Sequence, residues 1–267
     1  MKKLMFLFTI LLFVSCENNM SSEIKDDLDG NVIDDNNIFL NCDQLLDMSD
    51  LKLYSFVPFT DEEWRTMSYD YKLEQRQIPN DFLRDMTSKE LFYQVVYTDL
   101  SKNMLVFNTE QQGFESVKCL NMIPELLNRT DAGYVLLELL HKIDPAKITG
   151  LDCFWFDHCL QIILAQSIVI NRMTDEDIDN YIQQQIRCHD TIVELSKSND
   201  NWEYPQSVKT ILFGLGNVMI RYDFKPFMQT LNRNPDTNEL IWDTQYITEQ
   251  YALQLIDYIK QFIKTKK

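Results

Sequence analysis

Six residues that could bind a metal lie on two consecutive predicted helices. Thiolates and imidazoles are the usual ligands of zinc in proteins. The six are Cys153, Asp157, His158, Cys159, Cys188 and His189. On a helix, however, His158 and Cys159 point roughly 100° and 200° away from Asp157, so one ion could not gather all of them. We therefore predict no bound metal and no cofactor.

The three histidines, His141, His158 and His189, lie on predicted helices without any accompanying catalytic motif. The sequence contains no G-x-S-x-G elbow, no HExxH pair and no glycine-rich phosphate loop. Its 41 acidic residues offer many carboxylate pairs, but a glycosidase needs two of them facing each other across a cleft. No catalytic residue is assigned. A hydrolase acting on glycan or peptide is kept as the alternative function.

Five cysteines follow Cys16 in the sequence, and an odd number cannot all pair within one chain. They are Cys42, Cys119, Cys153, Cys159 and Cys188. Cys153 and Cys159 would be separated by about 9 Å of helical rise, which is too far for a disulfide. We therefore expect these cysteines to be free, buried thiols that pack as small apolar side chains.

Aromatic residues make up 12% of the chain, and most of them are expected in the core. Trp202 and Tyr204 are different, because they lie in a polar segment between two predicted helices and such segments run over the surface. We predict a ligand-binding role for these two. Trp64, Tyr69 and Tyr71 are further candidates for a face that binds sugar or peptide.

Residues 1–15 have the pattern of a signal peptide, in which basic Lys2 and Lys3 precede an apolar run over 4–14. That run is too short to span a bilayer. It ends in Phe13-Val14-Ser15-Cys16, which resembles the bacterial lipobox, with Phe13 in place of the usual leucine. We predict that Cys16 is lipidated and that the mature chain is held at a membrane of the bacterial cell envelope, on its periplasmic or surface face.

Residues 16–37 are rich in acids and poor in residues able to enter a core, so we predict a flexible tether. The formal net charge of the whole chain is −16. Nucleic acid is therefore an unlikely partner, since its phosphates are usually neutralised by Lys and Arg. The predicted partners are the membrane, through the lipid anchor, and a protein or glycan ligand.

Helix signals recur from residue 60 to the C-terminus. Thr60 and Glu63 form a capping box that opens a helix toward Gln77, and Ser88 caps a second helix. Residues 152–171 are apolar on most sides, which predicts one central helix, and residues 174–198 form a more polar helix beside it. The predicted helix starts fall near residues 60, 88, 112, 131, 152, 175, 206 and 245.

Short connections between successive helices make antiparallel neighbours, and the chain has too few glycines and prolines for a β-sandwich. We therefore predict that residues 38–267 form a single all-α domain of stacked antiparallel helical hairpins. Its packing is either that of an α-solenoid or that of an irregular helical bundle.

Three short stretches resemble a group of uncharacterised helical lipoproteins from gut Bacteroidetes. They are Met86-Thr87-Ser88-Lys89-Glu90-Leu91, Gln111-Gln112-Gly113-Phe114-Glu115 and Glu125-Leu126-Leu127-Asn128-Arg129-Thr130-Asp131-Ala132-Gly133. The resemblance covers residues 78–145 and implies an all-α extracytoplasmic domain, with no activity and no functional residue to transfer. Because no catalytic motif is present, we expect a ligand- or protein-binding module rather than an enzyme.

Overall fold

Helices form nearly all of the regular structure in the computed structural model, so the all-α prediction is confirmed. The structure describes residues 39–148, 150–197, 206–233, 240–241, 244 and 247–266. The first helices are α1 Cys42–Leu45, α2 Asp61–Thr66, α3 Tyr69–Glu74, α4 Asn80–Asp85, α5 Ser88–Tyr97, the 3-10 helix η1 Asp99–Val106, α6 Glu110–Val117, α7 Met122–Asn128 and α8 Ala132–His141.

The second half of the chain contains the longer helices. They are α9 Gly150–Leu164, α11 Asp175–Lys197, α12 Gln206–Arg221 and α14 Glu249–Lys266, with the shorter η2 Pro145–Lys147, α10 Ser167–Ile170 and α13 Lys225–Met228. The strands β1 Asn232–Arg233 and β2 Leu240–Ile241 pair antiparallel in a small ribbon.

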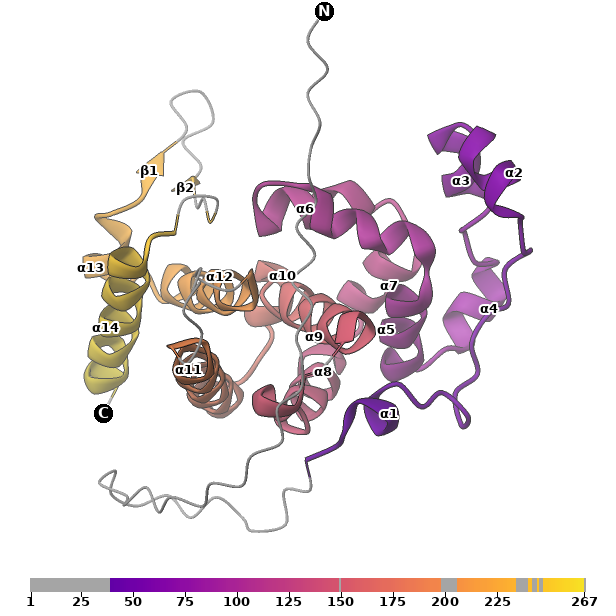
Figure 1. Cartoon of the computed structure of the whole chain (residues 1–267). Coiled ribbons are helices and arrows are strands. Elements are labelled where there is room, and N and C mark those ends of the chain that lie inside the picture. Colours follow the sequence, from indigo (N-terminus) through magenta and orange to yellow (C-terminus); the bar gives the residue numbers. More distant parts are fainter. Residues whose placement is uncertain are drawn as a thin grey trace, which may run out of the picture.

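Helix α9 lies at the centre of the molecule, as its all-round apolar sequence predicts. Its side chains from Trp155 to Leu164 are all buried. It contacts α5, α6 and α8 from the first half of the chain and α10 and α12 from the second half. Figure 1 shows α5 and α7 on one side of α9 and α11, α12 and α14 on the other. In a solenoid each repeat contacts only its neighbours, so these contacts favour the irregular bundle.

The single central helix predicted over 152–171 is in fact two helices. The chain leaves α9 at Ala165 and Gln166 and then begins α10. Side chains bind the carbonyl groups that the break exposes: Asn217 Nδ2 donates to Ala165 O at 3.0 Å, and Gln166 Nε2 donates to Ile162 O at 3.0 Å. These bonds take the place of the helical ones, which makes the break tolerable inside the core.

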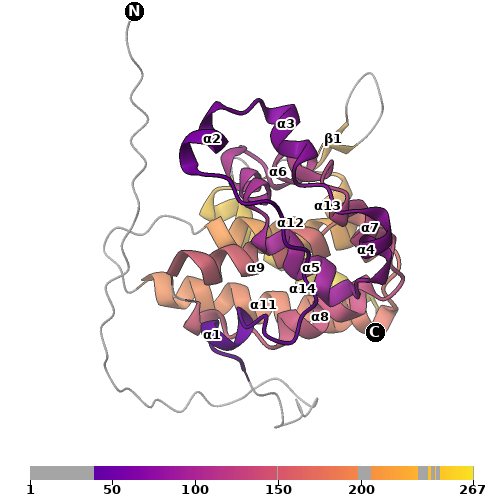
Figure 2. The ribbon, with the colours of Figure 1, turned by 90° about the vertical axis from the view of Figure 1, so that its right-hand side faces the viewer.

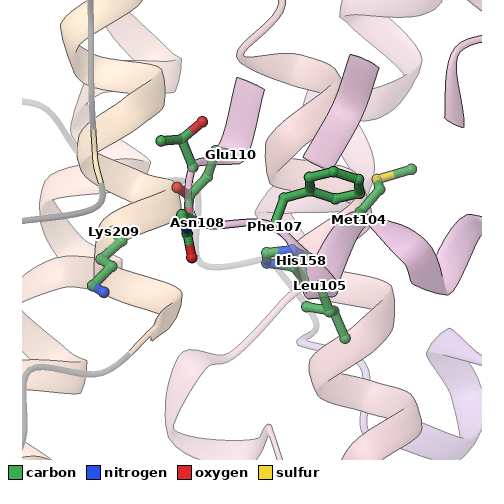
Figure 3. Close-up of a pocket in the computed structure, with 8 residues that line it drawn as sticks. Met104, Leu105, Phe107, Asn108, Glu110, His158 and Lys209 are labelled. Carbon is green, nitrogen blue, oxygen red and sulfur yellow. The ribbon is translucent and has the colours of Figure 1, made fainter. Parts of the chain in front are cut away.

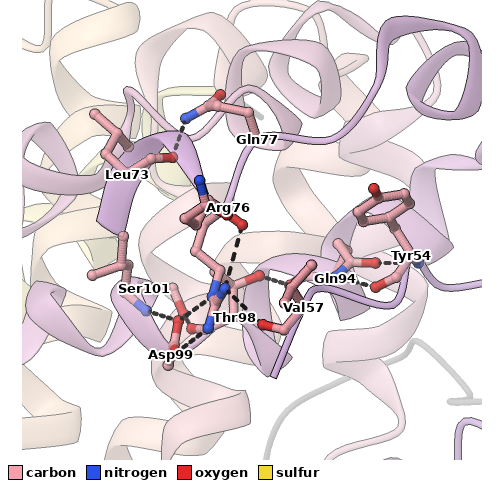
Figure 4. Close-up of polar contacts among 11 residues, drawn as sticks. Tyr54, Val57, Leu73, Arg76, Gln77, Gln94, Thr98, Asp99 and Ser101 are labelled. Carbon is pink, nitrogen blue, oxygen red and sulfur yellow. Dashed lines mark hydrogen bonds and ion pairs between the residues drawn. The ribbon is translucent and has the colours of Figure 1, made fainter. Parts of the chain in front are cut away.

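Arg76 is one of the residues that hold the segment before α4 against the bundle, and it is 7% exposed (Figure 4). Its Nε and Nη2 atoms donate to the two carboxylate oxygens of Asp99 at 2.9 and 3.0 Å, and Nη1 donates to the carbonyls of Val57 and Gln75. Three aromatic rings surround the guanidinium. Arg76 Cζ lies 5.2, 5.6 and 4.4 Å from the ring centroids of Phe56, Phe59 and Trp64. Because α2 and α3 bury no residue of their own, this cluster supplies much of their attachment.

Gln94 adds a second attachment for the same segment. Its side chain accepts from Tyr54 N at 2.7 Å and donates to Tyr54 O at 3.4 Å. Figure 2 shows α2 and α3 at the end of the bundle opposite α1 and α11.

A disulfide joins Cys42 in α1 to Cys153 in α9, with 5.6 Å between their Cα atoms. Our expectation of free, buried thiols is therefore wrong for these two residues. It is also wrong for Cys119, which is free but exposed, whereas it is correct for Cys159 and Cys188. The odd number of cysteines excluded complete pairing but not one pair. The fold brings Cys42 and Cys153 together across 111 residues, which helix spacing could not show.

Candidate functional site

A pocket of about 350 Å³ lies where η1, α6, α9 and α12 meet (Figure 3). Its described lining residues are Met104, Leu105, Phe107, Asn108, Thr109, Glu110, His158 and Lys209. Figure 3 shows Lys209 on one side, the apolar side chains of Met104, Leu105 and Phe107 on the other, and His158 between them. The pocket therefore has a charged side and an apolar side.

The start of α6 places Glu110 in the pocket wall. Thr109 is the N-cap, and its hydroxyl accepts from Gln112 N at 3.2 Å, so Glu110 occupies the first helical turn. Gly113 lets α6 approach η1 closely, because an added Cβ would overlap the carbonyl oxygen of Met104. A bulkier residue there would separate the two elements that bring Glu110 and Met104 to the same pocket.

His158 of α9 forms the buried wall of the pocket and is 3% exposed. Its ring stacks on that of Phe154, with 5.7 Å between the ring centroids, and its centroid lies 6.0 Å from that of Trp155. Nδ1 is 3.3 Å from the hydroxyl of Thr210, whereas Nε2 has no hydrogen-bond partner in the described part of the chain. Burial lowers the pKa of His158 to about 4, so the imidazole is neutral at neutral pH.

Glu110 is also 3% exposed, and two threonine hydroxyls bind its carboxylate. Thr210 Oγ1 donates to Oε1 at 3.4 Å, and Thr244 Oγ1 donates to Oε2. Burial raises the pKa of Glu110, and the Thr244 hydroxyl opposes this rise, as do Lys209 and Thr210. The result is a buried polar chain that runs from His158 through Thr210 and Glu110 to Thr244.

The order of this chain is not that of a catalytic triad. In a triad the histidine contacts the nucleophile through one nitrogen and the orienting acid through the other. Here Glu110 contacts Thr210, and Thr210 stands between the acid and the histidine. The arrangement instead fixes the orientation of the His158 ring at the pocket wall.

The described residues that line this pocket include none of the residues predicted to be lipidated or to bind a ligand. Cys16, Trp202 and Tyr204 lie outside the described residues. Among the other aromatic candidates, Trp64 packs on Arg76, while Tyr69 and Tyr71 are each 46% exposed on α3.

The candidate metal ligands are dispersed. Cys153 is in the disulfide, His158 faces Thr210, and His189 Nδ1 is 2.8 Å from Asp190 Oδ1. Within the part of the chain that the structure describes, no group of three or more His, Cys, Asp or Glu side chains is placed to hold a metal ion.

Reasoning from sequence missed Glu110, Thr210 and Thr244. Glu110 precedes the stretch Gln111–Glu115 and follows a threonine that is a good N-cap, which was the one local signal available. Thr210 and Thr244 are 100 and 134 residues away from it. No local pattern indicates that such distant hydroxyls meet one carboxylate.

No protein-family model matches this chain, and neither a curated protein nor a solved structure is significantly similar to it. Among the described helices, none is both long and apolar enough to cross a membrane.

Proposed function

We propose that this chain is an extracytoplasmic lipoprotein that binds a small polar ligand in the pocket between η1, α6, α9 and α12. One observation carries the proposal. A cavity of about 350 Å³ has Lys209 on one side and the apolar side chains of Met104, Leu105 and Phe107 on the other, so it offers a charged group and an apolar surface to one ligand.

Binding fits the pocket better than hydrolysis does. A glycosidase needs two carboxyl groups on opposite sides of the scissile bond, and Glu110 is the single carboxyl group among the described lining residues. Both of its oxygens already accept hydrogen bonds from threonine hydroxyls. The volume of about 350 Å³ lies near the lower end of the roughly 300–1,000 Å³ typical of ligand pockets, so it suits a ligand of about one sugar ring.

The disulfide between Cys42 and Cys153 supports the proposed location. Disulfides persist in oxidising compartments such as the bacterial periplasm and are rare in the cytosol. The signal-like residues 1–15 and the cysteine at position 16 point to the same export route.

The proposal is tested by titrating the purified full chain with monosaccharides, amino acids and peptidoglycan fragments, with protein NMR as the readout. Ligands that bind should shift resonances of the pocket residues. Lys209→Met should weaken binding, because it keeps a side chain of similar length but removes the ammonium group. Lys142→Met is the matched control, since the exposed Lys142 lies at the end of α8 and is not part of the pocket lining.

Two results would contradict binding as the function. One is a full panel that leaves the pocket resonances unchanged. The other is turnover of a chromogenic glycan or peptide substrate that survives repurification and disappears in Glu110→Gln.

A further inference from the structure

A second cavity, of about 160 Å³, lies where the connection between α7 and α8 meets the connection between α10 and α11. Apolar, aromatic and charged side chains line it, and the charges are of both signs. They include Leu127, Tyr134, Met173, Arg129, Arg172 and Asp177. This cavity is separate from the larger pocket between η1, α6, α9 and α12, because the described linings of the two share no residue. Its volume is close to the roughly 150 Å³ of an engineered cavity in another protein that binds benzene, so it suits a ligand of about six to nine non-hydrogen atoms.

Two arginines bring positive charge to the second cavity, and backbone carbonyls hold both in place. Arg172 donates through Nη1 to the carbonyl of Leu127. Arg129 donates through Nη2 to the carbonyl of Arg84 at 3.1 Å, and the same atom lies 2.8 Å from Glu125 Oε1. The charge of Arg129 is therefore partly balanced. Arg172, which is exposed, forms no ion pair with any residue that the structure describes, so its guanidinium is available to a carboxylate of a ligand.

Asp177 brings negative charge to the same cavity. Its Oδ2 atom accepts from the backbone N and the hydroxyl of Thr174, at 3.1 and 2.7 Å, and Thr174 Oγ1 accepts from Asp177 N at 3.1 Å. This capping box fixes the position of the carboxylate at the start of α11. The other oxygen, Oδ1, forms no hydrogen bond with a described residue and is not one of the buried polar atoms, so a ligand can reach it.

Neither arginine forms an ion pair with Asp177, although all three line one small cavity. An anion such as phosphate would satisfy the arginines but would add negative charge beside the Asp177 carboxylate. A zwitterion satisfies both signs, because its carboxylate and its ammonium group are separate and close together. It also carries no net charge, so the net charge of −16 on the chain does not oppose its approach as it would oppose that of an anion.

We propose that the second cavity binds a free α-amino acid with a small apolar side chain, such as valine. The α-carboxylate pairs with Arg172, the α-ammonium group donates to Asp177 Oδ1, and the side chain packs on Leu127 and on the ring of Tyr134, which is 58% exposed. The inference is independent of the function proposed for the larger pocket.

The test uses isothermal titration calorimetry on the full chain with matched probes. Valine carries both charges, isovalerate lacks the ammonium group, and isobutylamine lacks the carboxylate. We expect valine to bind about tenfold or more tightly than either analogue, because each analogue loses one hydrogen bond between charged groups. Valine should also shift the methyl resonances of Leu127 in protein NMR, which places it in this cavity. Inorganic phosphate should leave those resonances unchanged.

Two variants assign the two ends of the ligand. Asp177→Asn keeps an oxygen that can cap α11 and should weaken binding of valine and isobutylamine, but not of isovalerate. Arg172→Gln keeps a donor for the carbonyl of Leu127 and should weaken binding of valine and isovalerate, but not of isobutylamine. Glu176→Gln and Arg65→Gln are the matched controls, since both residues are exposed and neither lines the cavity, and they should change no affinity.

Three results would overturn the inference. One is equal affinity for valine and either of its analogues. Another is a valine affinity that stays unchanged in both Asp177→Asn and Arg172→Gln. The third is that neither valine nor alanine, serine or threonine shifts the Leu127 resonances. Because Lys209 does not line this cavity, none of these results bears on binding in the larger pocket.

Discussion

Asp157 and His158 are consecutive on α9 and are each 3% exposed, yet they face different helices. Asp157 bonds Gln161 on its own helix and lies near Cys188 of α11, whereas His158 contacts Thr210 of α12. Burial raises the pKa of Asp157 to about 6 and lowers that of His158 to about 4. Both groups are therefore more easily neutral in the fold than in water, and their effects on stability oppose each other.

We predict that these opposing effects nearly cancel between pH 4 and 6. The unfolded chain protonates His158 near pH 6.5 and the folded chain near pH 4, so stability falls by about 3 kcal/mol as pH decreases through this window. The unfolded chain ionises Asp157 near pH 3.8 and the folded chain near pH 6, so stability falls by about 3 kcal/mol as pH increases through nearly the same window.

Single substitutions should reveal each of the two pH dependences when the free energy of unfolding is measured with urea from pH 4 to 7. Asp157→Asn should leave a protein that loses stability steeply toward pH 4, and it should be more stable than the parent at pH 7. His158→Phe should give a protein whose stability increases toward pH 4. Glu110 contributes in the same direction, because burial raises its pKa as well. Parallel pH profiles for the parent and both variants would contradict the two shifts.

The disulfide between Cys42 and Cys153 should stabilise the fold substantially, because it closes a loop across 111 residues. The double substitution Cys42→Ser with Cys153→Ser should lower the free energy of unfolding by about 2–5 kcal/mol. Cys119→Ser is the control, since Cys119 is free and exposed, and it should have little effect. Peptide mapping after alkylation without reductant checks the pairing directly: modification of Cys42 and Cys153 in the unfolded parent would refute the bond.

Arg76 should contribute more to stability than an ordinary surface arginine. Arg76→Met removes the bidentate bond to Asp99 and leaves the carbonyl of Val57 without this donor, so we expect a loss of roughly 1–3 kcal/mol. Trypsin should also cut faster in α2 and α3, which measures how firmly that segment is attached. Arg84→Met is the control, because its pair with Asp81 is exposed and should contribute at most about 1 kcal/mol. Equal effects of the two variants would contradict a special role for Arg76.

Gly214 on α12 should resist a substitution that usually stabilises helices. Alanine normally gains about 0.5–1 kcal/mol over glycine inside a helix. Here an added Cβ would overlap the phenolic oxygen of Tyr181, which is fully buried, so Gly214→Ala should instead lose roughly 1–3 kcal/mol. Combining it with Tyr181→Phe should recover part of that loss in thermal unfolding. A stabilising Gly214→Ala would show that Tyr181 is placed differently.

Lipidation at Cys16 is tested by Cys16→Ala in the full chain. Without an acylated cysteine the protein should move from the membrane fraction to the aqueous fraction, and its intact mass should show no acyl chains. Membrane retention of this variant after a salt wash would contradict the anchor.

Local sequence signals predicted those features that depend on neighbouring residues. The capping box that begins at Thr60, and the helices that begin after Asp131 and Thr174, are found where the sequence indicated them. The predicted cap at Ser88 is one residue too late, because Thr87 is the N-cap of α5 and forms a capping box with Glu90. These contacts span three residues, so a linear pattern contains them.

One local feature was missed: the helix begun at Thr60 ends at Thr66, and Ser68 then caps α3, so the predicted run to Gln77 is interrupted.

Features that depend on distant residues were not predicted. The break after α9 uses Asn217 of α12, and the polar chain of the pocket joins α6, α9 and α12 through Thr210. Such contacts exist only once the helices have packed, and the same is true of the disulfide.

The disulfide also determines where a mechanical load would enter the molecule. For a chain held at Cys16, as we propose, tension reaches the described fold at its first residues. There Leu40 N donates to Lys142 O, and Cys42 is linked covalently to α9. Pulling therefore cannot peel α1 away and unravel the bundle from its end. The force passes directly to α9, which contacts helices from both halves of the chain. The oxidised protein should therefore unfold under force only when α9 leaves the core. The reduced protein should begin to unfold at α1.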